Sequence, residues 1–293
     1  MKRSASVLAC SLALFLVTAG LVSAKDRSDE AGIRAAVAAY VDSVYQVDPS
    51  LVEQRVHPRL QKMGYYIPDD ASDYFEVWMN YYEFLELAAG YNADGHIDSK
   101  TAPREIRIID RLDTTAVARV DAQWGIDFFH LAKKNGKWTI MNVIWQGYPP
   151  ESFASQSERD AKADVDGIRQ AALDYANSAY QVAPELIARS VHPHVQKVGY
   201  VHQREGDGYR ERWMNFTELQ QLVERWNVDN RRFDPATAKA EVEVLDRLDK
   251  IALARLDAEW GVDYFHLARK DGRWTIMNVI WQAYPKTEPA SDG

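Results

Sequence analysis

The chain has 293 residues and a formal net charge of −8, with 43 acidic against 35 basic side chains. This acidic balance, without clusters of lysine or arginine, argues against binding to nucleic acids or to anionic membrane surfaces. The sole cysteine, Cys10, lies in an apolar N-terminal stretch. Removal of that stretch would exclude disulfides, cysteine nucleophiles and cysteine-ligated zinc.

Residues 1–24 have the pattern of a secretory signal peptide. Lys2 and Arg3 precede an apolar run from Val7 to Val22, and small residues follow up to Ala24, where we expect cleavage. The run is interrupted and short for a membrane span of about 20 apolar residues. A lipid anchor at Cys10 is disfavoured because most of the apolar run follows it. We therefore predict a periplasmic or extracellular protein without membrane attachment after cleavage.

The remainder of the chain is a duplication. Residues 110–149 are nearly identical to residues 246–285, and residues 46–65 correspond to residues 181–200. A period this long indicates copied whole domains, because solenoid repeats have units of about 20 to 50 residues. We predict one domain at 28–149, a polar linker at 150–165, a second domain at 166–285 and a disordered tail at 286–293.

Each copy begins with helical patterns. In the first copy, apolar residues recur at helical spacing between Ile33 and Val44. A short helix is predicted from Pro49 to Val56, stopped by His57-Pro58, and a third from about Ser72 to Ala89.

The pattern then changes to a period of two, which predicts strands. Residues 116–124 alternate in this way, and Asn135-Gly136 and Asp271-Gly272 each lie between strand-like runs, the strongest short signal for a hairpin. The order of elements predicts an α+β fold with three N-terminal helices on a curved antiparallel sheet, present twice.

This order of elements resembles the nuclear transport factor 2-like (NTF2-like) superfamily. The resemblance lies in the helices, the His-Pro pair and the final strands, which read Asp-Phe-Phe-His-Leu and then Asn-Gly-Lys-Trp-Thr-Ile-Met-Asn-Val. The SnoaL-like and "putative lumazine-binding" branch is the most similar. The resemblance implies tandem cone-shaped folds, each with a pocket under its helices. It also implies a sheet surface of the kind through which single-domain members dimerise. It does not settle function, since this fold serves isomerases, cyclases, dehydratases and pure binding modules.

A two-residue turn at Asn135-Gly136 assigns the side chains to faces. Opposite residues share a face, so Asp127 and Phe129 should lie with Asn142 on the pocket side. Trp145 and Met141 should lie on the other side and pack against Trp281 and Met277 of the second copy. This predicts an intramolecular pseudo-dimer in a monomeric chain. A one-residue change in the turn would swap the faces and bring His130 and His266 to the pockets, as second-choice site residues.

The pocket chemistry then depends on one carboxylate in each copy. Asp127 with Asn142, and Asp263 with Asn278, would place a carboxylate and an amide in an apolar cavity, where burial raises a carboxyl pKa and suits it for proton transfer. The alternative, which we favour, is that the aspartates accept structural hydrogen bonds.

Histidines and aromatic residues complete the candidate site. His57 and His192 could reach the pocket mouth, although capping of a helix end is the commoner role of such a histidine. Aromatic side chains could form pocket walls or an ordinary core. The candidates are Tyr40, Tyr175, Trp124, Trp260, Phe129 and Phe265.

No spacing of ligands indicates a metal site, and no motif indicates a cofactor. We therefore predict a secreted tandem protein that binds a small apolar or aromatic molecule, or serves as an interaction module, without catalysis. The alternative is an acid/base enzyme of the isomerase, cyclase or dehydratase type that uses Asp127 and Asp263.

Overall fold

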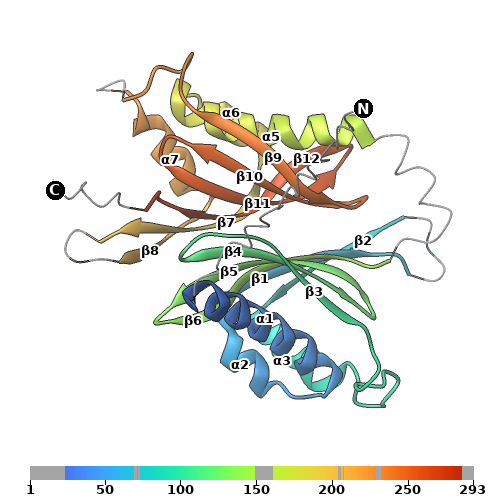
Figure 1. The fold of residues 1–293 in the computed structure, drawn as a ribbon. Coiled ribbons are helices and arrows are strands. Elements are labelled where there is room, and N and C mark those ends of the chain that lie inside the picture. Colours follow the sequence, from blue (N-terminus) through green and yellow to red (C-terminus); the bar gives the residue numbers. More distant parts are fainter. Residues whose placement is uncertain are drawn as a thin grey trace, which may run out of the picture.

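The computed structural model describes residues 24–68, 71, 73–148, 161–203, 206, 208–228 and 232–285. The predicted linker and tail lie largely outside these residues, as does the signal sequence up to residue 23. The structure consists of two copies of one α+β unit, so the predicted fold class is confirmed (Figure 1).

Copy 1 comprises α1 (Ala24–Tyr45), α2 (Ser50–Arg55), β1 (Val56–Tyr66), β2 (Phe75–Asn80), α3 (Tyr81–Gly90), β3 (Arg104–Arg111), β4 (Thr115–Ala122), β5 (Gly125–Lys134) and β6 (Lys137–Gln146). Copy 2 comprises α5 (Ala161–Gln181), α6 (Pro184–Ser190), β7 (Val191–His202), β8 (Tyr209–Met214), α7 (Phe216–Trp226), β9 (Ala240–Arg247), β10 (Ile251–Ala258), β11 (Gly261–Lys270) and β12 (Arg273–Gln282). The strand orders are β2-β1-β6-β5-β4-β3 and β8-β7-β12-β11-β10-β9. All pairings are antiparallel except β1 with β6 and β7 with β12.

The predicted helices were partly wrong, because the prediction missed two strands, β1 and β2, between the second and third helices. The short second helix ends at Arg55, just before His57-Pro58 as predicted, but the chain then continues directly as strand β1. The predicted third helix starts only at Tyr81, where Asn80 and Glu83 form a reciprocal capping box. The residues before it, Phe75–Asn80, pair with β1 as strand β2. Asn215 and Glu218 begin α7 in the same way.

The hairpin turn was predicted correctly, but the register beyond it was not. Lys134 pairs with Lys137, and both Asn135 and Gly136 have positive φ, as a two-residue hairpin turn requires. A register shift then occurs between His130 and Leu131. The bulge at Met141 moves every later residue of β6 to the opposite face. The same shift occurs in β11 and β12.

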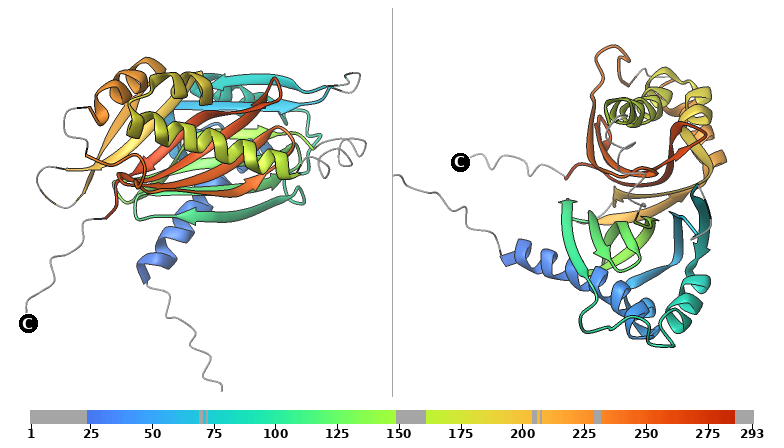
Figure 2. Two further views of the ribbon diagram at one scale, coloured as in Figure 1. Left: turned by 90° about the horizontal axis from the view of Figure 1, so that it is seen from above. Right: turned by 90° about the vertical axis from the view of Figure 1, so that its right-hand side faces the viewer.

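The two sheets pack face to face and the helices cover their outer sides (Figures 1 and 2). The core between the sheets contains Met63, Val117, Phe128, Met141 and Ile144 of copy 1, with Val198, Leu253, Tyr264, Met277 and Ile280 of copy 2. Trp145 and Trp281 were predicted to lie in this contact. The bulge instead places them on the helix side of their own sheets.

Polar groups in the contact between the sheets are paired reciprocally. The side-chain carbonyl of Gln282 accepts hydrogen bonds from the backbone N–H groups of Thr114 and Thr115, both at 3.0 Å. Gln146 accepts one from the backbone of Lys250 at 2.8 Å. Because buried polar groups are costly unless they are paired, these bonds fix one register between the copies.

Candidate functional site

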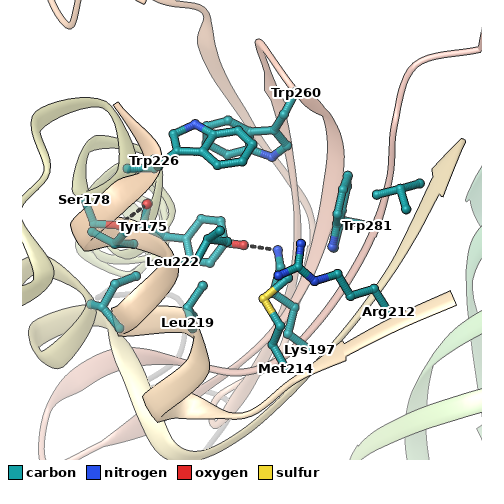
Figure 3. Close-up of a pocket in the computed structure, with 14 residues that line it drawn as sticks. Tyr175, Ser178, Lys197, Arg212, Met214, Leu219, Leu222, Trp226, Trp260 and Trp281 are labelled. Atoms are coloured by element: carbon teal, nitrogen blue, oxygen red, sulfur yellow. Dashed lines mark hydrogen bonds between the residues drawn. The ribbon is translucent and has the colours of Figure 1, made fainter. Parts of the chain in front are cut away.

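An apolar pocket lies in copy 2, between its helices and its sheet (Figure 3). It has a volume of about 120 Å³. Its lining combines helix and sheet residues: Tyr175, Ser178, Ala179, Ile187, Lys197, Val201, Arg212, Met214, Leu219, Leu222, Val223, Trp226, Trp260 and Trp281. An apolar cavity of about 150 Å³ holds benzene. The enclosed part of this pocket is therefore of the order of one aromatic ring.

A buried ion pair forms the polar floor of the pocket. Lys197 Nζ lies 3.0 Å from Asp263 Oδ1 and also donates a hydrogen bond to the Tyr175 hydroxyl. The Tyr175 hydroxyl donates to the same carboxylate oxygen at 3.1 Å, and Trp260 Nε1 donates to Oδ2 at 2.6 Å. Both oxygens of Asp263 are thus engaged by donors from α5, β7 and the turn between β10 and β11.

Copy 1 contains the same group with looser geometry. Lys62 Nζ lies 4.0 Å from Asp127 Oδ1 and donates to the Tyr40 hydroxyl at 2.8 Å. Trp124 Nε1 donates to Asp127 Oδ2 at 3.1 Å. Among the described residues, Asp127 Oδ1 has no hydrogen-bond partner.

Burial shifts the protonation equilibria of these groups. It lowers the pKa of Lys62 to about 8, against the opposing effect of Asp127. It also raises the pKa of the Asp127 carboxyl, although Lys62 acts in the other direction. The pKa of Lys197 is lowered by burial as well, and those of the Tyr40 and Tyr175 hydroxyls are raised well above the usual value. Desolvation thus opposes charge on both members of the copy 1 pair.

Two tryptophans owe their position in the pockets to glycines on the neighbouring strand. The indole of Trp281 lies directly over Gly199 of β7, and that of Trp145 lies over Gly64 of β1. Lys197 Nζ lies 5.1 Å from the centroid of the Trp281 ring, a cation–π contact. The glycines therefore set how close each indole comes to the sheet.

We expect Gly199→Ala to displace Trp281, because the added methyl would overlap the indole nitrogen. Overpacking of this kind costs about 1 to 3 kcal/mol in the free energy of unfolding. Urea denaturation, with tryptophan fluorescence as the second readout, would measure both effects. Gly90→Ala, where nothing lies within 4 Å of the added methyl, is the control. Equal midpoints for the two variants would contradict the assignment.

The copy 1 pocket is smaller because larger side chains occupy it. Phe84 stands where copy 2 has Leu219, and its ring stacks on Tyr40 with centroids 4.6 Å apart. Val44 replaces Ala179. The remaining volume is about 70 Å³. The two copies therefore share the ion pair but not the space above it.

Several of the sequence-predicted residues lie together at these pockets. Asp127 and Asp263 form the floors with Tyr40, Tyr175, Trp124 and Trp260. Phe129 and Phe265 are completely buried and contact Tyr40 and Tyr175 edge-on, each at 5.0 Å between centroids. They support the pocket from behind and do not line it.

Asn142 and Asn278 were wrongly placed in the pockets. The bulge in β6 and β12 turns them toward the other sheet, where Asn142 Nδ2 donates to Gln196 Oε1 at 2.6 Å and Asn278 donates to Gln61. They connect the two copies and do not contact the aspartates.

The histidines also lie between the copies, away from the pocket mouths. His57 stacks on Trp213 and His192 on Trp78, with centroids 5.3 and 5.6 Å apart. His130 and His266 stack on each other at 3.5 Å between centroids, at the centre of the contact between the sheets. Neither pair reaches a pocket.

The sequence prediction missed Lys62 and Lys197, the cations of both floors. They lie in the duplicated block at 46–65 and 181–200, where Lys-x-Gly-Tyr occurs twice. Recognition of this block as a strand would have placed each lysine on the same side as the glycine-supported tryptophan. Arg212 was missed because the first copy has Val77 at its position.

The described part of the chain contains no group of three or more His, Cys, Asp or Glu side chains able to hold a metal ion. Within the same residues, no helix has the length and apolar character needed to span a membrane.

A protein-family model described as "Putative lumazine-binding" matches residues 28–146 and again residues 163–282. Solved structures of NTF2-like proteins of unknown function are similar to one copy. The protein from Silicibacter pomeroyi DSS-3 is 17% identical over 42% of this chain and 98% of its own, with a TM-score of 0.35. The protein from Methylobacillus flagellatus KT is 24% identical over 42% and 93%, with a TM-score of 0.32. No curated protein matches the chain.

Proposed function

This chain belongs to the "Putative lumazine-binding" family, which it matches in both copies, and from that premise we propose that copy 2 binds a small, flat, largely apolar molecule without catalysis. The observation that carries the proposal is the pocket of about 120 Å³ under α7, with Trp226, Trp260 and Trp281 among its lining residues. Aromatic walls favour flat ligands by stacking and by burial of apolar surface.

The floor supports a binding role. A general acid or base must reach the substrate, yet Asp263 is completely buried and both of its oxygens already accept hydrogen bonds. The Lys197–Asp263 pair instead holds Tyr175 and Trp260 in fixed orientations beneath the cavity. The secretory leader predicted at residues 1–24 is part of the proposal, so the ligand would be met outside the cytoplasm.

The test is calorimetric titration with benzamide, a neutral probe with one aromatic ring, which matches the enclosed volume of about 120 Å³. Ala179→Val with Leu219→Phe gives copy 2 the residues of copy 1, and we expect the affinity to fall about tenfold or more because the cavity is filled. The matched control, Val44→Ala with Phe84→Leu, enlarges the copy 1 pocket and should leave binding by copy 2 intact. Equal probe affinity before and after filling would refute the proposal.

A further inference from the structure

The mouth of the copy 2 pocket carries a cation that copy 1 lacks. Arg212 on β8 lines the pocket and also the shallow groove outside it, which is formed by β8 and α7. Figure 3 shows its side chain extending from the strand toward the space between Met214 and Tyr175. The corresponding residue of β2 is Val77. The duplicated pockets thus differ in charge as well as in volume.

Arg212 is exposed, and its side chain makes no hydrogen bond or ion pair with any described residue. This distinguishes it from the arginines between the sheets. Arg119 and Arg255, for example, bind Asp246 and Asp110 of the opposite copy. The other cation that lines the pocket, Lys197, is paired with Asp263. One positive charge therefore remains at the pocket mouth.

The neighbouring groove strengthens the local positive charge. Arg225 and Arg232 line it together with Arg212, against the single carboxylate of Glu218. Arg225 is held by the Gln221 carbonyl, and Arg232 lies over the ring of Trp226. The copy 1 counterparts of Arg225 and Gln221 are Gly90 and Glu86. In a chain with a net charge of −8, this positive region favours an anion at copy 2 alone.

Two indole N–H groups in the pocket wall also lack partners. Trp226 Nε1 and Trp281 Nε1 are buried and have no acceptor among the described residues; copy 1 repeats the second of these at Trp145 but not the first. Buried N–H groups without acceptors are uncommon, and a ligand atom is one way to satisfy them. The copy 1 counterpart of Trp226 is Tyr91, which is 40% exposed.

We infer that the ligand of copy 2 is an aromatic monocarboxylate, with its ring against the tryptophans and its carboxylate on Arg212. A guanidinium matches the two oxygens of a planar carboxylate in a bidentate pair. Of the three arginines, Arg212 alone lines the pocket itself, so a ligand inside the pocket meets one guanidinium, which matches a monoanion. This inference rests on the proposed binding function and adds the chemical class of the ligand.

The experiment compares acids with their neutral amides by calorimetry. Benzoate and 2-naphthoate are titrated into the full-length protein beside benzamide and 2-naphthamide. We expect each acid to bind more tightly than its amide by about tenfold or more, and this advantage to shrink as salt screens the charge.

Arg212→Val, which copies Val77, should remove the preference for the acid over its amide. Arg212→Lys should keep part of the preference, because the charge remains and the bidentate geometry is lost. Arg210→Val is the matched control: it removes the same charge two residues earlier on β8, at a position that does not line the pocket.

The outcomes separate the two proposals. If acids and amides bind equally and Arg212→Val has no effect, the inference about the carboxylate fails while the pocket still binds aromatic molecules. If neither acids nor amides bind, the proposed function fails and the inference falls with it. A preference lost equally in Arg210→Val would show general attraction by the surface charge, which also overturns the role of Arg212.

Discussion

Asp263→Asn should lower the free energy of unfolding by about 3 to 5 kcal/mol, because it leaves the Lys197 ammonium buried without its counter-ion. Both side chains are almost inaccessible, at 4% and 0% exposed. Water therefore cannot replace the lost partner. Urea denaturation at neutral pH, followed by circular dichroism, measures the loss.

Two further variants test whether the loss of stability comes from the unpaired buried charge. Asp127→Asn should cost less, because the ion pair of copy 1 is 4.0 Å long and Asp127 Oδ1 has no hydrogen-bond partner among the described residues. The double variant Lys197→Met with Asp263→Asn should recover part of the loss, since no unpaired charge stays buried. If Asp263→Asn is as stable as the parent protein, the floor is not the structural element proposed here.

Acid should destabilise the contact between the two sheets. Burial lowers the pKa of His266 to about 3, and burial together with the neighbouring His266 holds the pKa of His130 well below its usual 6.5. The unfolded chain regains a value of about 6.5 and so binds more protons between pH 3 and 6.5. The free energy of unfolding therefore falls as the pH falls through this window, by up to about 1.4 kcal/mol per pH unit for each imidazole.

The measurement is the urea midpoint at several pH values between 4 and 7.5. His130→Phe with His266→Phe keeps an aromatic stack but cannot be protonated, so its pH dependence should be shallower than that of the parent. His96→Gln is the control, because His96 is exposed and its ring contacts Asp94 and Tyr91 near its own loop, not the other sheet. Parallel pH profiles for the parent and the double variant would contradict the assignment.

The duplication gives the two copies a common fold but different pocket linings. The residues between the sheets are nearly the same in both copies, since each must fit its counterpart across a pseudo-twofold contact. The pocket residues are under no such requirement. Phe84 against Leu219 and Val77 against Arg212 are differences that the sheet contact does not constrain, and they make the two pockets chemically distinct.

Sequence patterns were enough to predict the duplication, the α+β class, the hairpin turn at Asn135-Gly136 and the burial of the aspartates. These features depend on local signals: a repeated sequence, a change in the hydrophobic period, an Asn-Gly pair that favours positive φ and an isolated carboxylate in an apolar strand. Such signals can be read from the sequence without knowing which elements pack together.

Which side chains face the pocket, by contrast, depends on the packed fold. One extra residue at Met141 reverses the faces of Asn142 and Trp145. No local sequence propensity predicts a bulge at that position. The lysines reach the floors because β1 and β7 cross to pair in parallel with β6 and β12, a long-range contact that periodicity cannot predict. The pocket thus arises from register and strand order, which are fixed only when the sheets and helices are packed together.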